Sequence, residues 1–190
     1  MFLKSLFDYI FALILLILLV GLIICIVLLA TFDTKEFGIF QQIRVGKNGK
    51  LFKIYKIRTM RGVQVNSITT KEHRITPFGE FLRKYKLDEL PQLINILKGE
   101  MSFVGPRPDV VGYADELKGE DRIILTIKPG ITGPAQIKYR NEEVLLSQVE
   151  NPVKYNDEVL WPDKVKINKE YIKNWTFTKD LKYIIQTVIK

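Results

Sequence analysis

The sequence predicts a small, helix-rich α/β domain joined to one N-terminal membrane helix. Three observations carry this prediction: an uncharged apolar run near the N-terminus, a turn with apolar residues recurring on both sides, and later segments with apolar residues at helical spacing. At 190 residues the chain is long enough for one membrane segment and one domain with its own core. We therefore expect a membrane-embedded helix at residues 1–35 and a single domain at residues 36–190.

The charge of the chain favours an anionic partner. Lysine and arginine number 29 against 21 aspartates and glutamates, which gives a formal net charge of +8. Nucleic acid, anionic lipid headgroups and phosphorylated small molecules all fit this surplus, and charge alone does not choose among them. The one cysteine, Cys25, lies in the apolar run, which excludes an intramolecular disulfide and a cysteine-based metal site and favours a cytoplasmic domain.

Residues Tyr9 to Thr31 form an uncharged run of 23 residues. At a rise of about 1.5 Å per residue, a helix of this length crosses a hydrocarbon core of about 30 Å. The run is too long for a signal peptide and no small-residue cleavage site follows it. It is also unusually apolar for a core helix of a small soluble domain. The residues alone therefore predict a span, in which Gly21 is a weak place to bend.

The Asn-Gly turn within Val45 to Lys50 predicts a β-hairpin, because apolar residues recur on both sides of it. On the second strand, Lys53, Lys56 and Arg58 fall largely between the apolar positions. Such a series is either a solvated face or, beside a membrane, a surface that meets headgroups or a substrate phosphate. Residues 62–74 are polar and lack periodicity, which is typical of a mobile surface loop.

Two helices are expected in the middle of the chain. The first begins with Thr76 as its N-cap and a proline at its first position. The second is expected from Glu89 to Lys98, with Asp88 as its N-cap and Gly99 as its C-terminal stop. The plainest explanation of this adjacent acid pair is structural: Asp88 caps the helix and Glu89 complements its dipole.

Two nearby arginines favour a chemical role for the acid pair instead. Arg83 lies one turn and a bend upstream, within reach of the same space. Arg107 follows a short predicted strand, and Pro106 and Pro108 restrict the backbone on both sides of it. A guanidinium group is a natural bidentate clamp for phosphate. The stretch from Arg83 to Pro108 thus predicts an acid pair inside a basic, anion-binding pocket.

The remaining segments add cations and a last helix. The Gly- and Pro-rich stretch Lys128 to Gln136 lacks P-loop spacing, and is either a turn that approaches an anion or a plain structural loop. Arg140 adds positive charge beyond it. Asn141 to Pro162 is polar and acidic, and we expect a helix and an excursion there. With Thr178 as its cap, the last helix is amphipathic, and either packs on the core or lies at a membrane interface.

Several stretches of the chain, which together cover nearly all of it, match one known family. They are FD before the apolar run, the stretch from Phe40 to Gly46, FKIYKIRTM at Phe52 to Met60, LDELPQLINILKGEMSFVGPRP at Leu87 to Pro108, and KPGITGPAQ at Lys128 to Gln136. The chain resembles the small monotopic bacterial phosphoglycosyl transferases, the bacterial sugar transferase family that starts surface-glycan assembly on a polyprenyl phosphate. The central block is highly specific for this family.

The resemblance implies a two-step reaction. In this family the aspartate that corresponds to Asp88 attacks the β-phosphorus of a UDP-sugar, releases UMP and becomes a phosphosugar-aspartyl intermediate. Polyprenyl (undecaprenyl) phosphate then takes the phosphosugar. The resemblance places Mg²⁺ at Asp88 and implies that Glu89 orients or tunes it. Together with the residue patterns above, it leads us to expect substrate contacts from Arg58, Arg83, Pro106, Arg107, Pro108 and, more weakly matched, Arg140.

The resemblance also bears on topology. Family members usually carry Ser-Pro in the middle of the apolar segment, so that the helix enters and leaves by one leaflet; here Val20-Gly21 takes those positions. The resemblance implies a re-entrant helix, with the catalytic domain on the cytoplasmic face of the bacterial inner membrane. A span would put Met1 outside and keep the basic domain inside, which the positive-inside rule permits. Ending at Lys190, the chain is expected to be a catalytic core without the extra membrane helices of larger relatives.

The expected partners are a UDP-sugar, polyprenyl phosphate and the lipid bilayer, without nucleic acid; a homodimer is compatible with the amphipathic segments. The pathway is expected to be exopolysaccharide, lipopolysaccharide or another glycoconjugate, and the sugar contacts are expected in Asn141 to Pro162. The alternatives are a membrane-anchored basic protein that binds nucleic acid or anionic lipid without catalysis, and a scaffold that recruits glycan enzymes. The intact acid pair and both arginines argue against lost activity.

Overall fold

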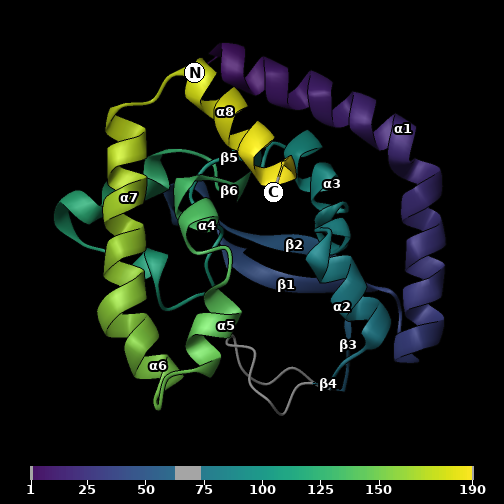
Figure 1. Ribbon diagram of the computed structural model, residues 1–190. Coiled ribbons are helices and arrows are strands. Elements are labelled where there is room, and N and C mark those ends of the chain that lie inside the picture. Colours follow the sequence, from purple (N-terminus) through teal and green to yellow (C-terminus); the bar gives the residue numbers. More distant parts are fainter. Residues whose placement is uncertain (1, 63–73, 190) are drawn as a thin grey trace. The chain divides into compact units, whose positions relative to one another are not determined.

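The computed structural model describes residues 2–62 and 74–189, which fold into two compact units (Figure 1). The first unit comprises Met1–Arg44 and Phe52–Met101, and the second comprises Val45–Leu51 and Ser102–Lys190. The expected division at residue 35, between a membrane helix and a domain, stays a prediction. The loop expected at residues 62–74 lies almost wholly outside the described residues.

The first unit contains one long helix, most of a β-hairpin, a short strand pair and two short helices. Its elements are α1 (Phe2–Thr34), β1 (Ile39–Val45), β2 (Leu51–Ile57), β3 (Met60–Arg61), β4 (Arg74–Ile75), α2 (Pro77–Lys84), the 3-10 turn η2 (Leu87–Glu89) and α3 (Gln92–Leu97). Strands β1 and β2 pair, and β3 pairs with β4 in antiparallel fashion.

Helix α1 extends the predicted apolar run in both directions without interruption. Only 11% of its most apolar window is buried, so α1 is not the core helix of a soluble domain; by length and composition it can cross a membrane. Figure 1 shows that α1 is bent, its two halves running in different directions. The helix contains no proline, and Gly21 is its one glycine. A Cβ atom at Gly21 would meet no heavy atom within 4 Å, so packing does not explain this glycine.

The core of the first unit joins α1 to the hairpin and to α2. Its buried members are Ile26 and Ala30 of α1, Ile57 of β2 and Leu82 of α2. The chain after α1 also approaches the helix closely, because a Cβ atom at Gly38 would lie 2.2 Å from the carbonyl oxygen of Val27. α1 contacts α3 as well. The C-terminal half of α1 is thus built into the unit.

The predicted hairpin is confirmed. Its turn is the 3-10 segment η1 (Lys47–Gly49). Asn48 and Gly49 have φ angles of 58° and 76°, in the left-handed region that asparagine and glycine adopt most readily. The Asn-Gly pair therefore specifies the turn locally.

The first of the two central helices is confirmed and the second is partly wrong. Thr76 caps α2, with its Oγ1 accepting a hydrogen bond from Gly79 N at 2.9 Å. The second helix, α3, starts after Pro91, and Asp88 does not cap it. The reason is Lys86, whose φ of 58° turns the chain into η2 before the helix begins. Gly99, with φ 75°, lies just past the end of α3, as expected.

The second unit is a helical assembly around two short parallel strands. Its elements are β5 (Ser102–Val104), η3 (Ala114–Glu116), η4 (Gly119–Thr126), β6 (Gly130–Thr132), α4 (Pro134–Lys138), α5 (Glu142–Ser147), α6 (Pro152–Tyr155), the π-helical turn η5 (Asn156–Leu160), α7 (Trp161–Lys173) and α8 (Phe177–Val188). Ser102 pairs with Gly130, and Val104 pairs with Thr132. The segment from Asn141 to Pro162 thus holds α5, α6, η5 and the start of α7.

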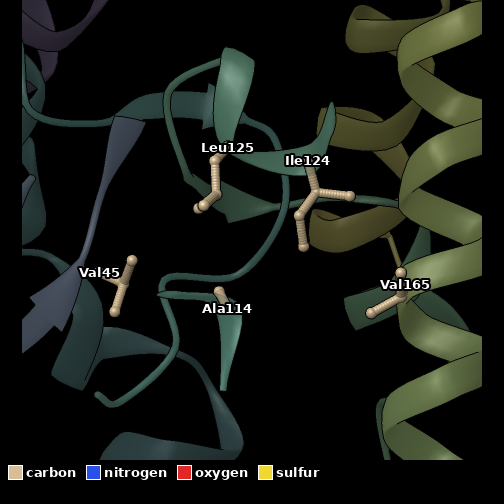
Figure 2. Packing of buried hydrophobic residues seen from close by; sticks show 5 residues of the cluster. All are labelled: Val45, Ala114, Ile124, Leu125 and Val165. Carbon is tan, nitrogen blue, oxygen red and sulfur yellow. The ribbon is translucent and has the colours of Figure 1, made fainter. Parts of the chain in front are cut away.

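The core of the second unit draws on residues far apart in the sequence. Figure 2 shows its buried members, from the end of β1, from η3 and η4, and from α7: Val45, Ala114, Ile124, Leu125 and Val165. Val45 also donates its backbone N–H to Asp109 O at 2.9 Å. The hairpin turn is thereby part of the second unit.

The C-terminal helix differs from the prediction in its cap. Thr176 caps α8, accepting from Lys179 N, so the expected cap at Thr178 is wrong. The buried Asp180 decides this, because it accepts hydrogen bonds from Tyr171 at 2.6 Å and from Trp175 Nε1 at 2.9 Å and so holds the first turn in place. α8 packs against α4, β5 and β6 and leaves an apolar stripe exposed, namely Leu181, Ile185 and Val188. Packing on the core is confirmed, and a membrane-interface role for the stripe stays a prediction.

Candidate active site

Asp88 and Glu89 lie in η2, in the short connection between α2 and α3. Both are buried, each with 7% of its surface exposed. The non-glycine residue before the turn, Lys86, adopts φ 58°, a conformation that costs energy and is concentrated at functional sites. Because Asp88 does not cap a helix, the structural explanation of the acid pair fails for this residue.

One oxygen atom of the Asp88 carboxylate, Oδ1, is buried without a hydrogen-bond partner among the residues that the structure describes. A buried acceptor without a partner costs about 1–3 kcal/mol, and more when it is charged. Native structures rarely tolerate such an atom unless a ligand, an ion or a reacting group engages it. The atom is thus available for chemistry.

The electrostatics of Asp88 combine burial with nearby charges. Burial, followed by the neighbouring Glu89 carboxylate, raises the pKa of Asp88 above its ordinary value. Lys56, Lys86 and Arg83 act in the opposite direction because their positive charges favour the carboxylate. The site therefore holds a desolvated carboxylate whose pKa is raised, with three cations nearby, and such perturbed groups are concentrated at functional sites.

Lys56 of β2 directly contacts the acid pair. Its Nζ atom lies 3.1 Å from Glu89 Oε1. Nothing in the sequence favours it over Lys53 or Arg58 in the same series. In the structure Lys53 is exposed, and Arg58, just after β2, pairs with Glu36.

Arg83 of α2, expected from the sequence to serve the site, is oriented by the β2–β3 corner. Its Nε donates to Thr59 Oγ1 at 3.0 Å, and its Nη2 lies 3.1 Å from Met60 Sδ. It is also close enough to act on the charge of Asp88. The structure thus brings Asp88, Glu89 and Arg83 into one electrostatic neighbourhood.

Arg58 is engaged elsewhere in the first unit. Its Nη1 lies 3.1 Å from Glu36 Oε2, and its Nε donates to Phe37 O at 3.0 Å. The guanidinium also lies over the Phe40 ring. These contacts tie the chain after α1 to the hairpin. The expected substrate contact of Arg58 stays a prediction.

The other expected substrate residues belong to the second unit. Arg107 is exposed on the loop after β5, between Pro106 and Pro108, which are both buried. The carbonyl oxygen of Pro106 accepts from Gly130 N at 2.8 Å. Arg140 donates from Nη2 to Gln186 O at 2.6 Å, near the end of α8. Their expected roles stay predictions.

The Gly- and Pro-rich stretch that contains β6, Lys128 to Gln136, is explained by close backbone packing against the chain after β5. A Cβ atom at Gly130 would lie 2.1 Å from Gly105 N, and one at Gly133 would lie 2.4 Å from Gly105 O. Of the two alternatives, the structural loop therefore accounts for these glycines. Their packing holds the backbone that leads into Arg107.

Sequence reasoning missed one buried polar residue of the first unit, Asn95. Its side chain is fully buried in α3 and bonds to β2 and to Glu100. The available signal was a single amide inside the otherwise apolar helix sequence LINIL.

The residues present fit a magnesium ion only with help from a substrate. Among residues 2–62 and 74–189, no group of three or more histidine, cysteine, aspartate or glutamate side chains is placed to hold a metal. Mg²⁺ is commonly bound by one or two carboxylates together with substrate phosphates and water. The buried, unpartnered Oδ1 atom of Asp88 fits that mode.

A buried acid pair beside several cations, in a chain that carries a long apolar helix, is the kind of site expected in a membrane-associated enzyme that handles anionic substrates. The model of the bacterial sugar transferase family matches residues 1–190, and this chain belongs to that family. It is 35% identical over 192 residues to the "Uncharacterized sugar transferase EpsL" of Bacillus subtilis, a match that covers 100% of this chain and 87% of the relative.

Relatives with named reactions are longer. The UDP-glucose:undecaprenyl-phosphate glucose-1-phosphate transferase of Escherichia coli is 36% identical over 160 residues, which cover 80% of this chain and 32% of that protein. The undecaprenyl-phosphate galactose phosphotransferase of Salmonella typhimurium is 39% identical over 114 residues, which cover 60% of this chain and 21% of that protein. The matched part of this chain thus corresponds to less than a third of the length of each of these two relatives.

Proposed function

We propose that this protein transfers a sugar-1-phosphate from a UDP-sugar to undecaprenyl phosphate, with Asp88 as the nucleophile. The observation that supports the proposal most is the Asp88 carboxylate itself, buried, without a capping role and beside Lys56, Lys86 and Arg83. The names of the relatives support the substrate classes. The product starts a surface polysaccharide or another glycoconjugate.

The first step is an attack on the pyrophosphate. A carboxylate oxygen of Asp88 forms a bond to the β-phosphorus, the bond from that phosphorus to the bridging oxygen breaks, and UMP leaves with that oxygen. The sugar-1-phosphate is then attached to Asp88 as an acyl phosphate, and the glycosidic bond is untouched. A carboxylate nucleophile divides one difficult transfer into two easier steps.

The second step regenerates the enzyme. A phosphate oxygen of undecaprenyl phosphate attacks the same phosphorus, the bond to the Asp88 oxygen breaks, and the carboxylate returns. Lys56 keeps Glu89 neutralised, and Arg83 stabilises charge on the phosphoryl oxygens. Mg²⁺ bound at Asp88 and at the substrate phosphates would supply further neutralisation of the pyrophosphate charge.

We test the reaction by measuring UMP release in lipid nanodiscs with undecaprenyl phosphate, Mg²⁺ and a panel of UDP-sugars. UDP-glucose and UDP-galactose come first, because both sugars occur in the names of relatives. Asp88→Asn should abolish release. Asp121→Asn, an exposed acid paired with Lys169 in the second unit, should leave it unchanged and serves as the matched control.

Trapping separates the covalent mechanism from direct transfer. A UDP-sugar labelled on its β-phosphate, mixed with enzyme in the absence of undecaprenyl phosphate, should leave label on Asp88, and hydroxylamine should remove it. UMP release that requires undecaprenyl phosphate and leaves no label on the protein would contradict the aspartyl intermediate.

We further propose that α1 enters and leaves by the cytoplasmic leaflet of the inner membrane, with the catalytic site on the cytoplasmic side. The bend of α1 in Figure 1 supports a re-entrant path. In a Cys25→Ala background, Ser5→Cys should react with an impermeant maleimide only from the cytoplasmic side. Labelling from the periplasmic side would show a span.

A further inference from the structure

Among the residues of the first unit that the structure describes, Asn95 has the most deeply buried polar side chain, with 0% of its surface exposed. Its Nδ2 atom donates to Lys53 O at 2.7 Å and to Glu100 Oε2 at 2.7 Å. Its Oδ1 atom accepts from Tyr55 N at 3.2 Å. The side-chain amide therefore makes three hydrogen bonds, in a helix whose other buried residues are mostly apolar.

The Asn95 amide takes the place of a neighbouring β-strand. It bonds to the carbonyl of Lys53 and the N–H of Tyr55, the two backbone groups on either side of Ile54. In a parallel sheet, one residue of the adjacent strand makes this same pair of bonds. Asn95 thus covers the edge of β2 and fixes α3 along that strand. Lys98 adds a second link, donating to Tyr55 Oη at 2.8 Å.

The bonds of Asn95 to β2 bear on how Lys56 and Glu89 are positioned relative to each other. Lys56 is the next residue of β2 after Tyr55, and Glu89 lies in the turn that leads into α3. The ion pair of Lys56 with Glu89 is partly exposed, with 18% of the lysine side chain accessible. Such a pair between two flexible side chains is weak unless its backbones are held at a constant spacing. The buried Asn95 bonds supply that spacing.

We propose that Asn95 is a positioning residue for catalysis: by pairing with the edge of β2 it holds Lys56 against Glu89 beside the Asp88 nucleophile. The inference rests on the proposed function for its consequence in turnover. Its structural part concerns only the first unit and is measurable without turnover.

Asn95→Leu removes the amide at nearly constant volume and introduces no charge. It should lower kcat about tenfold and leave the KM for the UDP-sugar within about twofold. This split is expected because Lys56 is no longer held against Glu89, whereas the substrate contacts are kept. Asn168→Leu makes the same change at a buried helix position of the second unit and should leave kcat unchanged.

A double-mutant cycle shows whether Asn95 acts through Lys56. Lys56→Met should lower kcat about as much as Asn95→Leu does, and adding Asn95→Leu should not lower it further. Additive losses of kcat in the double variant would overturn the proposal. So would a loss of kcat in Asn95→Leu that matches its loss of folded protein, because such a loss indicates general destabilisation alone.

Asn95→Gln provides the same cycle if the leucine variant does not fold, because glutamine keeps the amide and changes only its reach. The contact of Lys56 with Glu89 is also followed without turnover, from the NMR signal of the Lys56 Cε methylene group at one fixed pH in the wild type, in Asn95→Gln and in Glu89→Gln, with Lys56→Met for assignment. A Lys56 signal that moves in Asn95→Gln toward its position in Glu89→Gln supports the positioning role even if no UDP-sugar is turned over, in which case only the proposed function fails. A Lys56 signal that stays at its wild-type position in Asn95→Gln, but moves in Glu89→Gln, overturns the positioning role.

Discussion

Lys56 Nζ lies 3.1 Å from Glu89 Oε1, although the two residues are 33 positions apart in the chain. The contact joins the second strand of the hairpin to the turn that carries Asp88. It places a positive charge beside two adjacent carboxylates, one of which, Asp88, is the proposed nucleophile. The strength of this pair and its effect on Asp88 are directly measurable.

Lys56→Met should weaken catalysis more than substrate binding. Without the ammonium, Glu89 and Asp88 repel each other in a buried turn, and Asp88 is protonated more readily. We expect kcat to fall about tenfold or more, corresponding to about 1.4 kcal/mol. Lys154→Met, which alters an exposed pair with Glu158, is the control and should be neutral. A Lys56→Met enzyme with unchanged kcat would show that the pair only stabilises the fold.

The pH dependence of activity should follow the raised pKa of Asp88. In the proposed mechanism Asp88 reacts as a carboxylate, so kcat should fall as the pH drops through that pKa, which lies above the ordinary value of 3.8. The measurement is UMP release against pH, with the folded fraction checked at each point. A limb at or below the ordinary value would contradict the effect of burial.

The stability of the fold should depend on pH in the opposite direction to the activity. Because the folded pKa of Asp88 is raised, its contribution to stability is present below the unfolded pKa and is lost as the pH rises through the folded value. Asp88→Asn should therefore raise the apparent Tm at pH 7, by about 2–4 °C for each kcal/mol gained. The difference should shrink as the pH falls toward 3.8. A lower Tm for Asp88→Asn at pH 7 would show that Asp88 is mainly structural.

Thr59 should affect catalysis indirectly, by orienting the Arg83 guanidinium group. Thr59→Val removes the acceptor of Arg83 Nε at nearly constant volume, so the guanidinium loses its orientation. Hydrogen bonds to charged groups contribute about 1.5–3 kcal/mol, and we expect at least a tenfold loss of kcat/KM for the UDP-sugar. The comparison is Thr126→Val, which breaks an exposed bond to Ile123 O in the second unit and should have no effect. Equal activities of the two variants would remove Arg83 from the proposed mechanism.

Alanine substitutions at Gly38 and Gly21 together test how closely the chain packs around α1. A methyl group at Gly38 would lie 2.2 Å from Val27 O, whereas one at Gly21 would meet no heavy atom within 4 Å. Gly38→Ala should cost about 1–3 kcal/mol. Gly21→Ala should stabilise the helix by about 0.5–1 kcal/mol. Thermal unfolding in nanodiscs measures both, and similar Tm values would contradict the close approach after α1.

Local chemistry made several elements predictable. Asn48-Gly49 can adopt the left-handed turn of the hairpin whatever surrounds it, and Thr76 with Pro77 starts α2 through one side-chain bond. The N-cap of the last helix was harder to predict. Thr176 and Thr178 are chemically equivalent candidates, and the choice depends on Asp180, whose two donors come from α7 and the turn after it.

The candidate site was predictable in part. Asp88, Glu89 and Arg83 come from one short stretch, so their proximity follows from the sequence. The selection of Lys56 among three similar cations and the role of Asn95 were not predictable, because both depend on contacts between residues more than thirty positions apart.

By itself, the sequence determined the apolar helix, the hairpin, the acid pair and the family, because each is written in adjacent residues or in a continuous motif. Only the tertiary structure decided that Asp88 is not a helix cap, that its Oδ1 atom is buried without a partner among the described residues, and that Lys56 faces Glu89. The physical reason is that burial and ion pairing depend on which surfaces come into contact when the hairpin packs on the helices. These contacts join residues that are far apart in the chain, so no local sequence pattern specifies them.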